Sequence, residues 1–151
     1  MSDLSAALTV WEPLLGTWCG TGKAQNGATV RNRVQFSPAA LGEMLRLCWE
    51  SSDTKTDQYY HGVLAYLTAV HGGSLRAACV SSLHGAFVLT QQPDDPGVLV
   101  LAAVTAHNLR MQVTFVPEDD DWMLMTACAR PASHPPGQGP QLSVRLRRQQ
   151  A

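Results

Sequence analysis

The side chains of this 151-residue sequence that are able to do chemistry are five histidines, four cysteines and a few carboxylates. His61 lies in a strand-like segment, on the side that also carries Val63 and Ala65, so we expect its ring to point inward. An inward histidine either lines a cavity or donates to a backbone carbonyl in the core. Ser81 and Ser82 lie so close to His84 in sequence that nucleophile and base cannot easily converge, which argues against a serine hydrolase.

The remaining titratable residues do not form a catalytic pair. His71 and His107 precede Gly72 and Asn108 and are typical of turns. The acidic runs 94–95 and 118–121 also fall in turns, where such clusters usually face water, and they lack the spacing of a calcium loop. Glu50 is a lone acid within a strand. General acid–base chemistry usually needs two groups in opposed environments, so we expect no catalytic residue and favour a binding protein over an enzyme.

The four cysteines suggest neither a metal centre nor a redox motif. Cys19, Cys48, Cys79 and Cys128 stand far apart, without a C-x-x-C pair or a histidine at zinc spacing. We interpret them as small buried hydrophobic residues, because free cysteine is among the most buried residue types. No metal site is predicted.

Short strands with tight turns are predicted along almost the whole chain. Leu4, Leu8 and Trp11 recur at helical spacing and Pro13 ends that pattern, which predicts a short N-terminal helix. Gly, Pro, Asn and Asp then separate ten strand-like segments: 14–24, 29–37, 43–51, 58–70, 74–81, 85–92, 97–105, 108–116, 122–130 and 141–148. The sequence therefore predicts one all-β domain over 1–151, a ten-stranded antiparallel meander closed into a barrel.

Glycine recurs on alternate positions of the first predicted strand. Gly16, Gly20 and Gly22 lack a β-carbon, so this strand can coil and its neighbour can approach closely. Trp18 lies within that window, and we expect its indole to plug one barrel mouth with its N–H bonded to an acceptor. Arg145 or Arg147 on the last strand is the expected cation–π partner.

One segment is apolar on both faces, which a half-solvated strand does not require. Segment 97–105 reads GVLVLAAVT, so we expect its outer side to be covered by the N-terminal helix or by a second subunit. This leaves a homodimer open.

Composition argues against several partners. The formal net charge is −1 and only 15% of residues are charged, so no basic surface for nucleic acid is expected. The N-terminus lacks the basic start and apolar core of a signal peptide, and no apolar run is long enough to span a membrane as a helix. We therefore expect a soluble cytoplasmic protein with no membrane partner.

The opening stretch LGTWxGxG over 15–22, preceded by a short helix and Pro13, resembles the calycin superfamily of barrels, which includes lipocalin-like and fatty-acid-binding-protein-like folds. It is most similar to the nitrobindin-like heme-binding domains and to a bacterial lipocalin-like family of unknown function. Tyr60 to Tyr66 and the closing segment 142–148 fit the same families. The resemblance implies ferric heme held by a histidine just before the closing strand. Gln141 stands at that position here, and an amide is a poor iron ligand.

The leading prediction is a small apolar ligand in the barrel interior. Its expected wall residues are large side chains at strand positions: Trp18, Tyr60, Tyr66, Met111 and Phe115. The alternative is a heme-binding protein of the nitrobindin type with redox or isomerase chemistry, in which His134 or His61 would replace the missing iron ligand. His134 lies in a Pro- and Gly-rich loop that is otherwise typical of a solvated connection.

Overall fold

Ten strands and two short 3₁₀ helices make up the chain in the computed structural model, which describes residues 3–24, 27–134 and 142–150, without the side chain of Tyr60. The 3₁₀ helices are η1 (Thr9–Leu14) and η2 (Ala40–Gly42). The strands are β1 (Gly16–Lys23), β2 (Thr29–Ala39), β3 (Met44–Asp53), β4 (Tyr59–Ala69), β5 (Leu75–Ser81), β6 (Gly85–Gln92), β7 (Leu99–Val104), β8 (Leu109–Pro117), β9 (Trp122–Pro131) and β10 (Leu142–Arg148). The ten predicted strands are confirmed.

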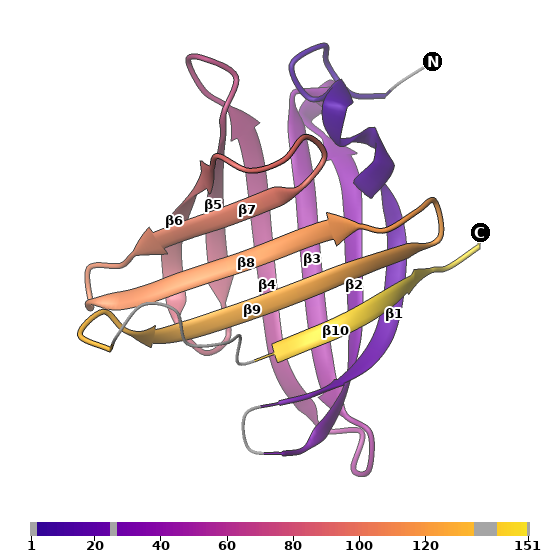
Figure 1. The fold of residues 1–151 in the computed structure, drawn as a ribbon, viewed down its shortest axis with the longest axis vertical. Coiled ribbons are helices and arrows are strands. Elements are labelled where there is room, and N and C mark those ends of the chain that lie inside the picture. The colour runs from indigo at the N-terminus through magenta and orange to yellow at the C-terminus, as the bar shows by residue number, and fades with distance from the viewer. Residues whose placement is uncertain (1–2, 25–26, 135–141, 151) are drawn as a thin grey trace.

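The strands close into a barrel. Each strand pairs antiparallel with the next, and β1 also pairs with β10, with Trp18 opposite Arg148 and Gly22 opposite Val144. In Figure 1, strands β7 to β10 run across the front of the barrel and cross the direction of the strands behind them. Among the described strands, closure leaves no free sheet edge, which confirms the all-β, calycin-like barrel.

The glycines of β1 form the seam with β10. A β-carbon on Gly20 would collide with the carbonyl oxygen of Arg145, and one on Gly22 would come within 2.9 Å of the carbonyl oxygen of Ser143. Neither backbone atom can move without disturbing the pairing. The close approach predicted from the sequence is therefore what the seam requires.

The N-terminal segment closes one end of the barrel. Leu4, Leu8, Trp11 and Leu14 are buried in the same apolar cluster as Trp18. The backbone N–H of Ser5 donates to the carbonyl of Gly42 in the β2–β3 connection across 2.9 Å. The predicted short helix is the 3₁₀ helix η1, and Pro13 lies inside it rather than after it. No helix in the described ranges has the length and apolarity needed to cross a membrane.

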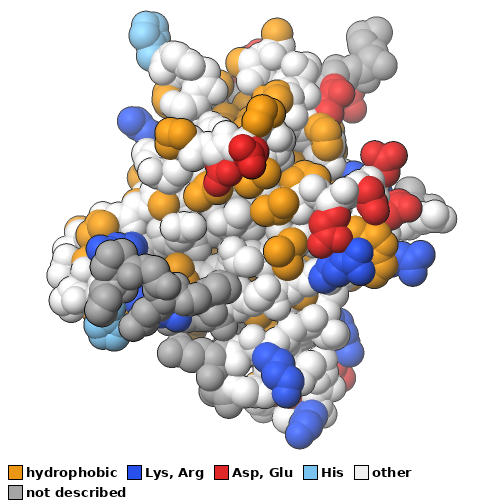
Figure 2. All heavy atoms as spheres, in the orientation of Figure 1, with side chains coloured by type: hydrophobic (Ala, Val, Ile, Leu, Met, Phe, Trp, Pro, Cys, Tyr) orange, Lys and Arg blue, Asp and Glu red, His pale blue; other side chains and the backbone are white. Residues whose placement is uncertain are grey.

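The outer side of β7 is covered only at its start. Val100 is 7% exposed, whereas Val104, on the same outer face, is 57% exposed. The N-terminal segment therefore does not cover the second half of 97–105, and cover by a second subunit stays a prediction. Val80 and Val88 are also exposed on the outside of the barrel, and apolar side chains are visible on the face that β7 and β8 present (Figure 2).

Candidate ligand-binding cavity

A cavity of about 290 Å³ occupies the end of the barrel opposite the N-terminal segment. Its lining comes from strands β2 to β10, from the β5–β6 turn and from Ala24, which directly follows β1. Most of the wall is apolar and includes Val63, Ala65, Phe87, Leu101, Met111 and Phe115. This volume lies at the lower limit of ligand pockets, which span about 300 to 1,000 Å³.

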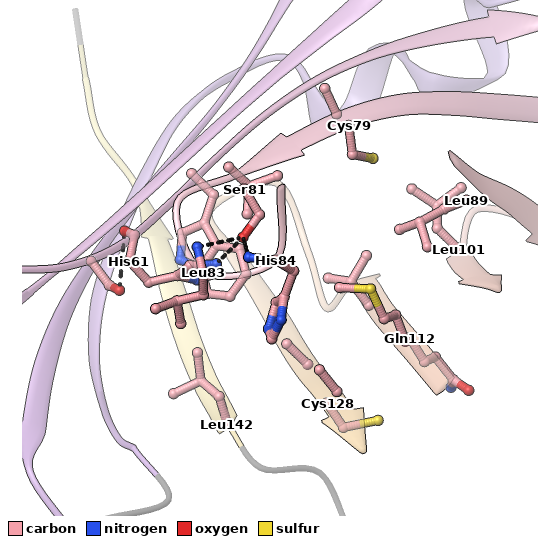
Figure 3. Close-up of a pocket in the computed structure, with 18 of the residues that line it drawn as sticks. His61, Cys79, Ser81, Leu83, His84, Leu89, Leu101, Gln112, Cys128 and Leu142 are labelled. Carbon is pink, nitrogen blue, oxygen red and sulfur yellow. Dashed lines mark hydrogen bonds between the residues drawn. The ribbon is translucent and has the colours of Figure 1, made fainter. Parts of the chain in front are cut away.

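Polar side chains gather on one side of this cavity. His61 comes from β4, Ser81 from the end of β5 and His84 from the β5–β6 turn, and all three line the cavity (Figure 3). The Nε2 atom of His61 lies 2.9 Å from the Oγ atom of Ser81. The centroids of the His61 and His84 rings are 6.3 Å apart. The cavity thus has a mostly apolar wall and, on one side, a hydrogen-bonding cluster of His61, Ser81 and His84, which we call the cavity head.

The hydrogen bonds of Ser81 fix the tautomer of His61. The Oγ atom of Ser81 accepts the backbone N–H of Leu83 at 3.1 Å and that of His84 at 3.2 Å. A hydroxyl has two lone pairs and one proton, so both lone pairs are engaged and the proton is left for Nε2 of His61. We therefore assign Nε2 as the acceptor and Nδ1 as the N–H of a neutral imidazole.

The surroundings of His61 favour its neutral form. Burial and, to a smaller extent, the electrostatic effect of His84 lower the pKa of His61 from 6.5 to about 4. Trp49 packs edge-to-face against the ring, with centroids 4.7 Å apart. The indole N–H of Trp49 donates in turn to Oδ1 of the fully buried Asn32 across 3.0 Å. The imidazole is therefore neutral at pH 7 and held in one orientation.

The Ser81 and His61 pair does not have the geometry of a nucleophile and its base. An attacking serine needs a lone pair directed at the substrate, and both lone pairs of Ser81 are directed at backbone N–H groups of its own turn. We interpret Ser81 as a residue that positions His61. The sequence considered Ser81 only beside His84, with which it was not expected to converge, and did not predict the contact of Ser81 with His61. That contact depends on the β4–β5 register, which places Val63 opposite Ser81.

Two of the predicted wall residues line the cavity, namely Met111 and Phe115. Trp18 does not: it is fully buried near the closed end, and its N–H donates to the carbonyl of Leu14 across 2.9 Å. The guanidinium carbon of Arg148 lies 4.1 Å from the centroid of the Trp18 ring system. The prediction of Arg145 or Arg147 as the cation–π partner is therefore wrong, because the register places Arg148 opposite Trp18.

The two arginines expected near Trp18 lie over a different indole. The guanidinium carbons of Arg145 and Arg147 are 4.1 Å and 5.7 Å from the ring centroid of Trp122. Arg145 also pairs with Glu118, at 2.8 Å between Nη2 and Oε2. These contacts hold the β8–β9 connection against β10 and lie on the outside of the barrel.

Other predicted site residues lie away from the cavity. Tyr66 is 38% exposed and does not line the cavity, so the prediction that it forms part of the wall is wrong. Alternation along β4 turns its side chain outward. Tyr60 belongs to β4, but its side chain lies outside the described part, as does Gln141. His134 is exposed after β9, where its carbonyl accepts from Arg110 at 3.4 Å, and it does not line the cavity.

The four cysteines are free thiols, and the predicted burial is confirmed only for Cys79. Cys79 is buried and lines the cavity, and desolvation raises its thiol pKa to about 11, against a smaller opposing effect of a backbone hydrogen bond near Leu89. Cys19, Cys48 and Cys128 are half-buried. Within the described ranges, no three His, Cys, Asp or Glu side chains are grouped to hold a metal ion.

Comparison with known proteins identifies the fold and no family. No protein-family model and no curated protein matches the chain. The solved structure of Rv2717c from M. tuberculosis is similar over 98% of this chain and 100% of that chain, with a TM-score of 0.70 and 21% identity. A fluorescence-activating β-barrel designed de novo aligns over 99% of this chain and 100% of that chain, with a TM-score of 0.49 and 14% identity. At such an identity the likeness to Rv2717c shows that the two chains share a fold, which in this chain is a closed ten-stranded antiparallel barrel.

Proposed function

We propose that this protein binds a small apolar molecule inside the barrel and does so without catalysis. The observation that carries the proposal is a cavity of about 290 Å³ at one end of a closed barrel, with a mostly apolar wall and a few convergent polar groups. Pockets of this composition are typical small-molecule sites. The fixed hydrogen bonds of Ser81 argue for recognition rather than chemistry at this site.

The wall suits apolar ligands of varied shape. Met111 is flexible and polarizable, and Phe87 and Phe115 offer ring faces and edges. Burial of apolar ligand surface contributes about 25 cal/mol per Å² before the entropic cost of binding. A bicyclic aromatic compound is therefore a suitable first ligand for testing.

A cavity-filling substitution tests the proposal. Val63 faces the cavity, whereas Leu64, the next residue of β4, does not line it. We expect Val63→Phe to weaken the binding of 2-ethylnaphthalene at least about tenfold, because the added ring occupies the ligand volume. Leu64→Phe on the other face is the matched control and should bind like the wild type. Equal binding by all three proteins, measured by isothermal titration calorimetry, would contradict an internal site.

A heme-binding protein is the alternative that the resemblance implies. Of its two histidines, His134 does not line the cavity, and the Nε2 atom of His61 is engaged by Ser81. The described donor set therefore fits a resident heme poorly and favours the apolar ligand. Addition of hemin separates the two: a sharp Soret band that disappears in His61→Ala or His134→Ala would support the heme alternative against our proposal.

The physiological ligand is accessible by native mass spectrometry of protein purified from its own host. We expect an additional mass that is lost on mild heating or organic extraction. A co-purified mass in the wild type that is missing from Val63→Phe would place that molecule in the cavity.

A further inference from the structure

We propose that the cavity selects an uncharged ligand whose polar head carries a hydrogen-bond acceptor, and that the Nδ1–H of His61 donates to this head. The inference rests on the proposed function and adds the chemical class of the ligand. Three observations carry it: the charge of the lining, the tautomer of His61 and the access to its free nitrogen.

The lining carries no permanent charge. None of the described residues that border the cavity is Asp, Glu, Lys or Arg. A carboxylate or an ammonium group placed there would lose its hydration without gaining a permanently charged counter-ion, and a buried charge without such a partner is strongly unfavourable. The cavity is therefore built against fatty-acid-like anions and against amines, and it favours neutral molecules.

His61 presents a donor. Since the Ser81 hydroxyl donates a hydrogen bond to Nε2, which must then be unprotonated, the second ring nitrogen carries the N–H. The neutral state of the ring also follows from its surroundings, in which burial and His84 both disfavour a second proton. A donor fixed in this way selects an acceptor on the ligand, such as a ketone, aldehyde, ether or ester oxygen.

The Nδ1 atom of His61 is accessible in a residue that borders the cavity. Nδ1 of His61 makes no hydrogen bond to another described residue. Among the described residues, every fully buried side-chain nitrogen or oxygen atom has a hydrogen-bond partner, so an atom without one is accessible. Nδ1 is therefore not sealed in the protein, and the ring borders the cavity. His84, whose ring lies 6.3 Å from that of His61, is a second imidazole at the same head of the site.

Three naphthalenes of nearly equal size test the inference. They are 2-acetylnaphthalene, which is neutral with an acceptor, 2-ethylnaphthalene, which is neutral without one, and 2-naphthoate, which is anionic. At pH 7.5 we expect the ketone to bind about fivefold more tightly than the ethyl compound, the net effect of one good hydrogen bond. The naphthoate should bind at least about tenfold more weakly than the ketone. His61→Phe should abolish the preference for the ketone while still binding the ethyl compound.

A second readout does not depend on that variant. Imidazole ¹⁵N NMR of the wild type should show His61 as the Nδ1–H tautomer, with a shift of this N–H on addition of the ketone and a smaller one with the ethyl compound. Equal or tighter binding of 2-ethylnaphthalene or 2-naphthoate, or an Nε2–H tautomer, would overturn the inference and leave the proposed function standing. Failure of all three compounds to bind would overturn both.

Discussion

The imidazole of His61 and the hydroxyl of Ser81 meet across 2.9 Å at the wall of the cavity. Ser81 also accepts hydrogen bonds from two backbone N–H groups of the turn that leads into β6. This one side chain therefore links β4 to the β5–β6 turn and determines the tautomer of His61. The consequences for stability, pH dependence and ligand binding are separable by substitution.

Removal of the Ser81 hydroxyl should release His61. In Ser81→Ala we expect a loss of about 1 to 2 kcal/mol in the free energy of unfolding, because two backbone donors and an imidazole lose a partner. The pKa of His61 should also change, since its Nε2 no longer faces a hydroxyl. Urea unfolding and an NMR titration of the ring measure both effects.

Ser82→Ala is the matched control for that substitution. Ser82 also accepts a backbone N–H, from Gly62 at 3.0 Å, but the His61 ring bonds to Ser81 and not to it. Its loss should cost about 1 kcal/mol and leave the His61 titration unchanged. A His61 titration altered equally by both substitutions would contradict the role of Ser81.

The low pKa of His61 predicts a loss of stability in mild acid. The pKa of His61 is about 4 in the folded protein and 6.5 in the unfolded chain. Between these two pH values the unfolded chain binds a proton at His61 that the folded protein does not bind. The contribution of His61 to stability is therefore complete above pH 6.5 and decreases as the pH falls from 6.5 towards 4. Because the ring is partly exposed, solvent screening limits the loss to about 1 to 2 kcal/mol.

Urea unfolding at pH 7.5 and pH 4.5 measures this effect. His61→Gln should lose less stability than the wild type between the two pH values, whereas His107→Gln, an exposed turn histidine, should behave like the wild type. If the wild type and His61→Gln lose the same amount, His61 does not titrate as described.

Gly20→Ala should disrupt the seam between β1 and β10. The added methyl group would collide with the Arg145 carbonyl, which is itself part of the barrel backbone. We expect a loss of about 2 to 4 kcal/mol in the free energy of unfolding, as for other severe overpacking. Thermal and urea denaturation followed by circular dichroism measure it.

Gly72→Ala separates steric collision from ordinary glycine effects. Gly72 has a φ of +87°, but a β-carbon there meets no atom within 4 Å. Its substitution should cost only the strain of a left-handed conformation, about 1 kcal/mol. A Gly20→Ala protein as stable as Gly72→Ala would mean that β10 does not approach β1 so closely.

The architecture was predictable because it depends on local signals. Period-two alternation and the Gly, Pro, Asn and Asp breaks predict every strand to within a few residues, and the glycines of β1 predict a tight seam. The same alternation could have predicted that the Tyr66 side chain points outward, because a strand that turns His61 and Val63 inward must turn Tyr66 outward. The aromatic character of Tyr66 is a weaker guide than its position in the strand.

The cavity head was not predictable from the sequence alone. The contact of Ser81 with His61 depends on the β4–β5 register, and that of Arg148 with Trp18 on the β1–β10 register. Registers are set by the turn geometry and by barrel closure, which neighbouring residues do not encode. His84 falls between the predicted strands 74–81 and 85–92, but that the turn at this point lines the cavity depends on the packed barrel.

We propose above that a ligand enters the hollow end of the barrel, and methyl NMR of the methionines shows whether it does. Met111 lines the cavity, whereas Met44 and Met123 do not. On titration with 2-ethylnaphthalene we predict a saturable ring-current shift of the Met111 methyl signal, with little change at Met44 and Met123. An unchanged Met111 signal at saturating ligand, or equal shifts at all three methionines, would contradict the claim.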